Sequence, residues 1–427
     1  MKKLTLFLLM LLFALCFYSC SDTEDDDGTY NGEVITLNVY NWGEYISDGF
    51  EDSVDTNAEF EKYCRDVLGL NVRVNYTTYA TNEDMYSKIK SGAGTYDIII
   101  PSDYMIQKMI AEDMLLEFDV AAEIENYVYI DSDFKNKYYD PANRYTVPYT
   151  YGMTGIIYNT TMVDEEDLGS WGLLWNPKYT GKILQLNNPR DAFGSAMYWK
   201  NIDINSTEEA DWDLALSYLV QQKALVQGYV NDEIFNKMTS GSAAIAPYFV
   251  GDFITMLDSN EHLDFFYPEE GVNVFVDAMC IPKNAKEPEL AKEYINFMLT
   301  EEIAVANALY IGYASPNVQV RENEEYIEEM GDLLDLLYAD VETTYSYDPY
   351  YHSFTPEMQS YVNTLWESLK TESSTEPWVH VTAIVIVVGV LTPLIYSVYI
   401  KKRRSKDYRE RDKQIKLSKK AQKKANL

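Results

Sequence analysis

Carboxylates and aromatic side chains at the ends of predicted strands are the groups of this chain best suited to chemistry. The clearest example is Asp277, which interrupts an apolar strand predicted over residues 274–281. A carboxylate buried there without a partner would be costly, so we expect Asp277 to meet a cation or hydrogen-bond donors. The alternative is that Asp277 marks an exposed strand edge.

Motifs of catalysis and metal binding are scarce. The sequence has three histidines, His262, His352 and His380, and no HExxH, GxSxG or CxxC pattern. Residues 92–94 lack the third glycine of a dinucleotide-binding loop, and the calcium-loop-like residues 201–212 end in Trp where the loop needs Glu. These observations predict a protein that is not an enzyme and that holds no cofactor or metal.

The size of the chain indicates how many lobes it has, and its charge indicates which class of partner it binds. Single cores seldom grow beyond about 250 to 300 residues, so a chain of 427 residues predicts two lobes. Residues 401–427 have 13 basic and 3 acidic side chains, whereas the residues before them have 22 basic and 65 acidic ones. This acid excess would repel a phosphate backbone, which argues against nucleic-acid binding and favours small cations as partners.

The N-terminal residues have the pattern of an export signal. Lys2 and Lys3 precede an apolar run over residues 4–18, which is too short to cross a membrane comfortably. The run ends in a sequence similar to a bacterial lipobox, in which Cys20 would be lipid-modified; the alternative is a signal without a lipid. We expect residues 1–20 to be a lipoprotein-type signal peptide and residues 21–32 to be a flexible acidic tether.

The C-terminal region is predicted to cross a membrane. Residues 378–400 contain His380 and no Asp, Glu, Lys or Arg, and four basic residues follow them. A helix of this length spans a bilayer, and the basic flank would place residues 401–427 in the cytoplasm. The alternative is a buried core helix. The middle of the chain would then be membrane-anchored and extracytoplasmic, at the cell surface or in the periplasm.

Between these segments, strand and helix patterns alternate. Strands are predicted over residues 34–40, 72–76 and 96–100, with helices at 60–68 and 85–89 between them. This order predicts a parallel sheet whose ligand crevice lies at the carboxyl ends of the strands.

A second unit is predicted from about Tyr149 onwards. Its strands are expected at residues 155–159, 182–186, 241–247 and 272–282, and an amphipathic helix at 288–299. Another helix is expected after Ser206, which would form a capping box with Glu209.

Four cysteines occur in the chain. Cys16 and Cys20 belong to the signal, which leaves Cys64 and Cys280 for the folded part. One bridge between them is possible, but their spacing matches no zinc or redox motif, so we expect ordinary buried thiols.

Several ordered stretches combine aromatic, acidic and small residues. They are YNWGEY (40–45), YATNEDMY (79–86), YDIIIPSDY (96–104), VPY (147–149) followed by Gly152 and Gly155, residues 171–181, and IGYASPN (311–317). Together they resemble the extracytoplasmic polyamine-binding proteins of ABC importers, over about residues 33 to 370.

The resemblance implies a two-lobed α/β fold, the type II fold of periplasmic binding proteins, with a hinge and a ligand cleft between the lobes. Lobe 1 would comprise residues 33–148 and 275–315, and lobe 2 residues 149–274 and 316–372. With the predicted transmembrane helix at 378–400, this is the fold class that we expect.

The resemblance also implies a set of ligand-binding residues. Asn188 and Asp191 stand where the spermidine type has two acids, and Phe249 and Phe275 where it has tryptophans. Asp252 instead matches an aromatic-x-Gly-Asp pattern of putrescine-type relatives. The full set is Trp42, Gly43, Glu44, Tyr45, Ser102, Tyr104, Asn188, Asp191, Phe249, Asp252, Phe275, Asp277 and Tyr313.

These expectations describe a solute-binding subunit that captures putrescine or spermidine outside the cell and delivers it to an ABC permease. The physical requirements agree, because a polyamine needs anionic acceptors at intervals and flat apolar walls between them. Two alternatives stay open. One is a binding protein for another cationic solute or a metal, and the other is a membrane-tethered extracellular sensor or interaction module.

Overall fold

The computed structural model describes residues 33–50, 53–340 and 347–371, and short parts of 409–418. The predicted signal peptide with Cys20, the tether and the predicted membrane span at 378–400 lie outside the described residues. Among the described residues, no helix has the length and the apolar character needed to cross a bilayer. The fold-class prediction is therefore corrected to a two-lobed α/β fold, and the C-terminal transmembrane helix is not retained as part of it.

Lobe 1 is built on the predicted β-α-β-α-β order. Its parallel strands pair in the order β2-β1-β3, and the helices α2 and α3 connect them. Their bounds are β1 (Ile35–Trp42), α2 (Thr56–Tyr63, followed by a π-helical turn at Cys64–Leu68), β2 (Val72–Tyr79), α3 (Asn82–Lys90) and β3 (Ile98–Ile99). Gly69 ends the turn with φ 67°, a left-handed conformation that favours glycine.

Two long strands connect the lobes. Strand β4 (Thr146–Asn159) pairs with β9 (Val274–Cys280) along its first half, and with β7 and β8 along its second half. Strand β9 also pairs with β3 of lobe 1, where Ile99 faces Cys280. Because β4 changes partners near Met153 and Thr154, the sheets of the two lobes meet there, and β4 and β9 are the natural hinge segments.

Lobe 2 is a second mixed sheet covered by helices. Strand β5 pairs in parallel with β6 and β7. The elements are β5 (Ile183–Leu186), α6 (Pro189–Trp199), α7 (Glu209–Gln222), β6 (Val226–Val230), α8 (Glu233–Thr239), β7 (Ile245–Phe249), α9 (Val250–Leu257) and β8 (Leu263–Phe266). Trp171, Phe193 and Trp212 lie in its buried core.

The predicted capping box at the start of α7 is wrong. The N-cap residue is Glu208, which makes no side-chain capping bond. The hydroxyl of Ser206 instead accepts a hydrogen bond from the amide of Glu208 and donates one to the carboxylate of Asp211. In a capping box the Glu209 carboxylate would accept from the backbone amide of Ser206, but this amide donates to the carbonyl of Asp203. Trp212 is buried on this helix.

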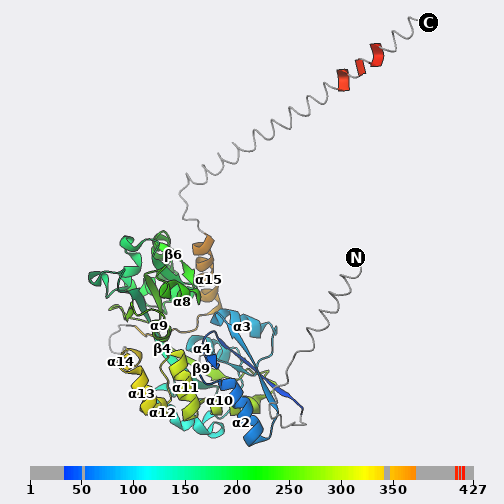
Figure 1. Cartoon of the computed structure of the whole chain (residues 1–427), viewed down its shortest axis with the longest axis vertical. Coiled ribbons are helices and arrows are strands. Elements are labelled where there is room, and N and C mark those ends of the chain that lie inside the picture. The colour runs from blue at the N-terminus through cyan, green and yellow to red at the C-terminus, as the bar shows by residue number, and fades with distance from the viewer. Residues whose placement is uncertain are drawn as a thin grey trace, which may run out of the picture.

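The C-terminal helices cover both lobes (Figure 1). Helices α10 (Pro288–Met298) and α11 (Glu301–Ile311) contribute to the core of lobe 1, and α15 (Pro356–Thr371) packs on α6 and α7 of lobe 2. Three helices lie between α11 and α15 in the sequence and pack near α9. They are α12 (Val318–Glu322), α13 (Glu324–Met330) and α14 (Leu333–Leu337). The exact lobe boundaries along the chain stay a prediction.

The remaining helices of the described part are short. They are α4 (Asp103–Ala111), α5 (Val120–Glu123) and the 3-10 turns at Glu125–Tyr129, Ser132–Phe134, Glu165–Asp167, Trp171–Trp175 and Pro177–Tyr179. Cys64 and Cys280 are buried free thiols, as expected.

Candidate functional site

A pocket lies between the two lobes, at the carboxyl ends of β1 and β3 and beside the hinge strands. About 130 Å³ of it can hold the centre of a water molecule, and its mouth is open to solvent. All thirteen residues in the predicted set line it. The structure therefore brings together residues from six separate stretches of chain, although their contact with a ligand stays a prediction.

The pocket is strongly acidic. The lining residues include one guanidinium, that of Arg190, and six carboxylates, those of Glu44, Glu83, Asp191, Asp232, Asp252 and Asp277. Glu44 and Asp232 are exposed to solvent, Asp277 is buried, and the other three are partly buried. Such a lining attracts cations and repels anions.

Asp277 lies on β9 and is only 3% exposed. Its Oδ2 accepts a hydrogen bond of 2.7 Å from the hydroxyl of Tyr45, while its Oδ1 has no hydrogen-bond partner among the described residues. Burial raises the pKa of Asp277 to about 6, and the nearby hydroxyl groups of Ser102 and Tyr45 offset part of that rise. The alternative of an exposed strand edge is excluded, because β9 pairs with β3 and β4 on its two sides.

The loop after β1 supplies the aromatic part of the wall of lobe 1. The indole nitrogen of Trp42 donates a hydrogen bond of 2.9 Å to the carbonyl of Ile100, and its ring lies 4.5 Å from the ring of Tyr79. Glu44 occupies the left-handed region at φ 52°, and its side chain is exposed. These contacts hold the Trp42 ring rigidly, as a wall of a cation site requires.

Ser102 and Tyr104 lie at the start of α4, opposite α3. The hydroxyl of Ser102 makes no capping bond. It accepts a hydrogen bond of 3.1 Å from the amide of Asn82, whose Nδ2 also lies 3.2 Å from the hydroxyl of Tyr104. Tyr104 in turn donates to a carboxylate oxygen of Glu83 at 3.1 Å. This network orients four polar side chains toward the pocket.

Asn188 and Asp191 lie at the N-terminus of α6. Asn188 is its N-cap residue, and its Nδ2 donates to the carboxylate of Asp191 at 2.5 Å. The carboxylate also accepts a hydrogen bond of 3.3 Å from the hydroxyl of Tyr351. Burial raises the pKa of Asp191, and bonds from Asn188 and Tyr351 and the nearby charge of Arg190 oppose that rise.

Asp252 lies in the first turn of α9 and accepts a hydrogen bond of 2.9 Å from the hydroxyl of Tyr313. Burial raises the pKa of Asp252 to about 7, helped by the neighbouring charges of Asp232 and Glu44 and opposed by Tyr313. A Cβ atom at Gly251 would lie 2.3 Å from the Tyr313 ring. The glycine of the aromatic-x-Gly-Asp pattern is therefore needed for this close approach.

Two phenylalanines complete the apolar wall beside the hinge. The rings of Phe249 and Phe275 meet edge to face at 5.2 Å, and Phe275 contacts Tyr313 at 6.2 Å. Their faces are smaller and less electron-rich than indole rings, so they bind a cation more weakly than tryptophan would. The wall is nevertheless continuous with Tyr45, whose ring lies 5.0 Å from that of Tyr313.

Comparison with known proteins agrees with this geometry. A family model described as bacterial extracellular solute-binding protein matches residues 57–331. This chain belongs to that family. The family's description also supports the expected extracytoplasmic location.

Curated relatives of this solute-binding protein come from several bacteria. A spermidine/putrescine-binding periplasmic protein of Escherichia coli K12 is 32% identical over 67% of this chain and 79% of its own length. A similarly named protein of Haemophilus influenzae is 30% identical over 75% of this chain and 87% of its own length. A putrescine/cadaverine-binding protein of Pseudomonas aeruginosa is 27% identical over 78% of this chain and 93% of its own length.

Solved structures show the same architecture. A Listeria monocytogenes structure described as a spermidine/putrescine ABC transporter superposes with a TM-score of 0.71 at 33% identity, over 79% of this chain and 99% of that one. The substrate-binding protein PotD of Streptococcus pneumoniae gives a TM-score of 0.63 at 34% identity, over 78% of this chain and 98% of that one. The two-lobed fold of the prediction is thereby confirmed.

Sequence reasoning missed several residues that line the pocket. The most important are Arg190, which is buried, and Tyr351, which comes from a segment far along the chain. A signal for Arg190 existed, because it stands between the two predicted residues Asn188 and Asp191. Tyr351 had no signal of its own, and its neighbour His352, which was left out of the predicted set, is not among the lining residues.

Proposed function

We propose that this protein is the solute-binding subunit of an ABC importer and that it captures a polyamine, putrescine or spermidine, outside the cell for delivery to the permease. Closure of the two lobes around the ligand is its working step, and no bond in the ligand is made or broken. The family supports the role of solute binding, and the relatives' names support the class of ligand.

The observation that supports the ligand class most directly is the unpartnered Oδ1 of Asp277. A buried carboxylate oxygen without a donor is costly, and an ammonium group of the ligand would remove that cost by donating to it. Around it, Trp42, Tyr45 and Phe275 offer ring faces and edges to the methylene groups between ammonium charges.

Calorimetric titration of the protein with putrescine, spermidine and the uncharged sugar maltose tests this proposal. We expect both amines to bind and to raise the thermal midpoint, because a ligand that binds only the folded state stabilises it. Binding of maltose and not of the amines would reject a cation site. Binding of a metal ion alone would favour the other cationic-solute alternative.

We also propose that a lipid on Cys20 attaches the protein to the membrane. The support is the lipobox-like sequence that precedes this cysteine. Labelling of cells with a radioactive fatty acid should mark the wild-type protein and not Cys20→Ser. Equal labelling of both would contradict the proposal.

A further inference from the structure

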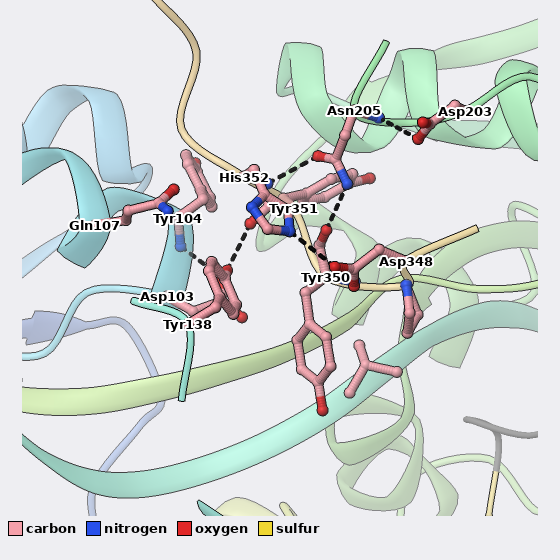
Figure 2. Close-up of polar contacts among 12 residues, drawn as sticks. Asp103, Tyr104, Gln107, Tyr138, Asp203, Asn205, Asp348, Tyr350, Tyr351 and His352 are labelled. Atoms are coloured by element: carbon pink, nitrogen blue, oxygen red, sulfur yellow. Dashed lines mark hydrogen bonds and ion pairs between the residues drawn. The ribbon is translucent and has the colours of Figure 1, made fainter. Parts of the chain in front are cut away.

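A short segment between α14 and α15, residues 348–353, contacts both lobes and the pocket. We name it the strap. Figure 2 shows it passing between lobe-1 residues around Asp103 and Tyr138 and lobe-2 residues around Asn205. The strap is separate in sequence from the hinge strands β4 and β9, so it is a third connection between the lobes.

On the side of lobe 2, the strap is held through its backbone. The side-chain amide of Asn205 donates to the carbonyl of Tyr350 at 2.8 Å and accepts from the amide of His352 at 2.8 Å. The guanidinium of Arg190 donates to the carbonyl of His352 at 3.2 Å. These bonds make the strap part of lobe 2.

On the side of lobe 1, the side chains of Tyr138 and Gln107 bond to the strap backbone, and the ammonium of Lys137 lies 3.5 Å from the Tyr350 hydroxyl. The hydroxyl of Tyr138 donates a hydrogen bond of 2.6 Å to the carbonyl of Tyr351, and the Tyr138 ring lies 4.4 Å from the His352 ring (Figure 2). The side-chain oxygen of Gln107 on α4 accepts a hydrogen bond of 2.8 Å from the amide of Ser353. Both bonds cross from one lobe to the other.

The strap also supplies a wall of the pocket. Tyr351 lines the pocket, and its hydroxyl donates to the backbone carbonyl of Arg190 and lies 3.3 Å from the carboxylate of Asp191. The Arg190 guanidinium lies 4.3 Å from the centre of the Tyr351 ring. Gln107 and Tyr138 do not line the pocket, so they reach a ligand only through the strap.

We propose that Gln107 and Tyr138 are positioning residues for ligand capture: they bind the strap when the lobes close, and thereby fix Tyr351, Arg190 and Asp191 at the pocket wall. This inference rests on the proposed function. The bonds to Tyr351 and Ser353 bridge the cleft, so opening of the lobes must break them. They stabilise the closed, ligand-holding state and act equally on every ligand that requires closure.

The substitution Tyr138→Phe tests this, since it keeps the ring against His352 and removes only the hydroxyl. We expect the dissociation rates of putrescine and spermidine to rise by the same factor, about threefold to tenfold, the effect of one lost hydrogen bond, with unchanged association rates. The thermal midpoint of the ligand-free protein should not change, because the contact is absent when the lobes are open.

Tyr158→Phe is the matched control, because the Tyr158 hydroxyl donates to Asp264 within lobe 2 and does not line the pocket. It should leave both dissociation rates unchanged. Unchanged dissociation rates in Tyr138→Phe would overturn the inference, because they indicate that the hydroxyl has no role. Unequal effects on the two amines would overturn it too, because they indicate direct contact with the ligand. A lower thermal midpoint of the ligand-free protein would indicate a purely structural role and would also overturn it.

A second experiment needs no ligand. In the double variant Gln107→Cys and Ser353→Cys, oxidation should join the strap to lobe 1 and trap the closed state. We expect the radius of gyration from small-angle scattering to be smaller for the oxidised than for the reduced protein. Equal radii would overturn the inference even if amines bind, whereas failure of the wild-type protein to bind amines would reject the proposed function alone.

Discussion

The buried acid Asp277 and the partly buried acid Asp191 lie in the same pocket and have opposite surroundings. Asp277 has one carboxylate oxygen without a partner among the described residues, and its other oxygen is bonded to the neutral Tyr45. Asp191 is bonded by Asn188 and Tyr351 and lies beside the charge of Arg190. The protein itself satisfies Asp191, whereas Asp277 has bonding capacity left for a ligand.

Asp252 is intermediate between these two. It has one donor, Tyr313, and its neighbours Glu44 and Asp232 have the same sign of charge. We therefore expect the ammonium groups of a ligand to be drawn to Asp277 and Asp252 more strongly than to Asp191. The predictions below test this ranking.

The substitution Asp277→Asn should have the largest effect. It replaces the unpartnered charge by a neutral amide, and a hydrogen bond to a charged group contributes about 1.5 to 3 kcal/mol. Affinity for a polyamine should fall roughly tenfold to a hundredfold by calorimetry. Asp113→Asn is a suitable control, because Asp113 is an exposed acid paired with Lys283. Unchanged affinity in Asp277→Asn would show that this carboxylate does not meet the ligand.

Lowering the pH should weaken binding on the order of tenfold between pH 8 and pH 6. The pKa of Asp277 is raised to about 6 and that of Asp252 to about 7, so by pH 6 Asp252 is mostly protonated and Asp277 about half protonated, and both lose attraction for a cation. Calorimetry across the pH series measures this loss. Affinity that does not depend on pH would contradict the raised pKa values.

The stability of the ligand-free protein should change in the opposite direction. Acids with raised pKa values bind protons more tightly in the folded than in the unfolded state. The contribution of Asp277 and Asp252 is therefore fully present below about pH 4 and is lost as the pH rises through about 6 to 7. Denaturant unfolding without ligand should show it as a loss of stability between these values.

A smaller effect is expected for Asp191→Asn. The charge removed is already opposed by Arg190, and Asn188 and Tyr351 hold the side chain in place. We expect affinity to fall about threefold to tenfold, below the loss for Asp277→Asn. A larger loss than that of Asp277→Asn would reverse the ranking of the two acids.

The smallest effect should be a gain. Phe249→Trp places a stronger cation-binding ring on the wall beside Asp252, and a better cation–π contact is worth about 0.5 to 1 kcal/mol. Affinity should rise about twofold to fivefold. Leu257→Met, on the helix α9 that follows Phe249 and outside the pocket, is a control for altered packing.

Local patterns allowed much of this protein to be predicted. The β-α-β-α-β order of lobe 1 follows from the apolar period of residues 34–100, and the buried acid Asp277 follows from its place in an apolar strand. The start of α7 was predicted wrongly, because the Ser206 hydroxyl accepts from the amide of Glu208 and donates to Asp211, while the backbone amide of Ser206 donates to Asp203. Capping depends on such local competition, which a motif does not describe.

The sequence by itself determined the order of strands and helices in lobe 1, the acid excess and the residue types of the pocket, because backbone periodicity and charge depend on neighbours along the chain. Only the tertiary structure decided that Tyr351 joins Arg190 and Asp191, residues separated from it by 161 and 160 positions. It also decided which acid is left without a partner. Both depend on how distant segments pack, since the packing determines which donors come within reach of each carboxylate.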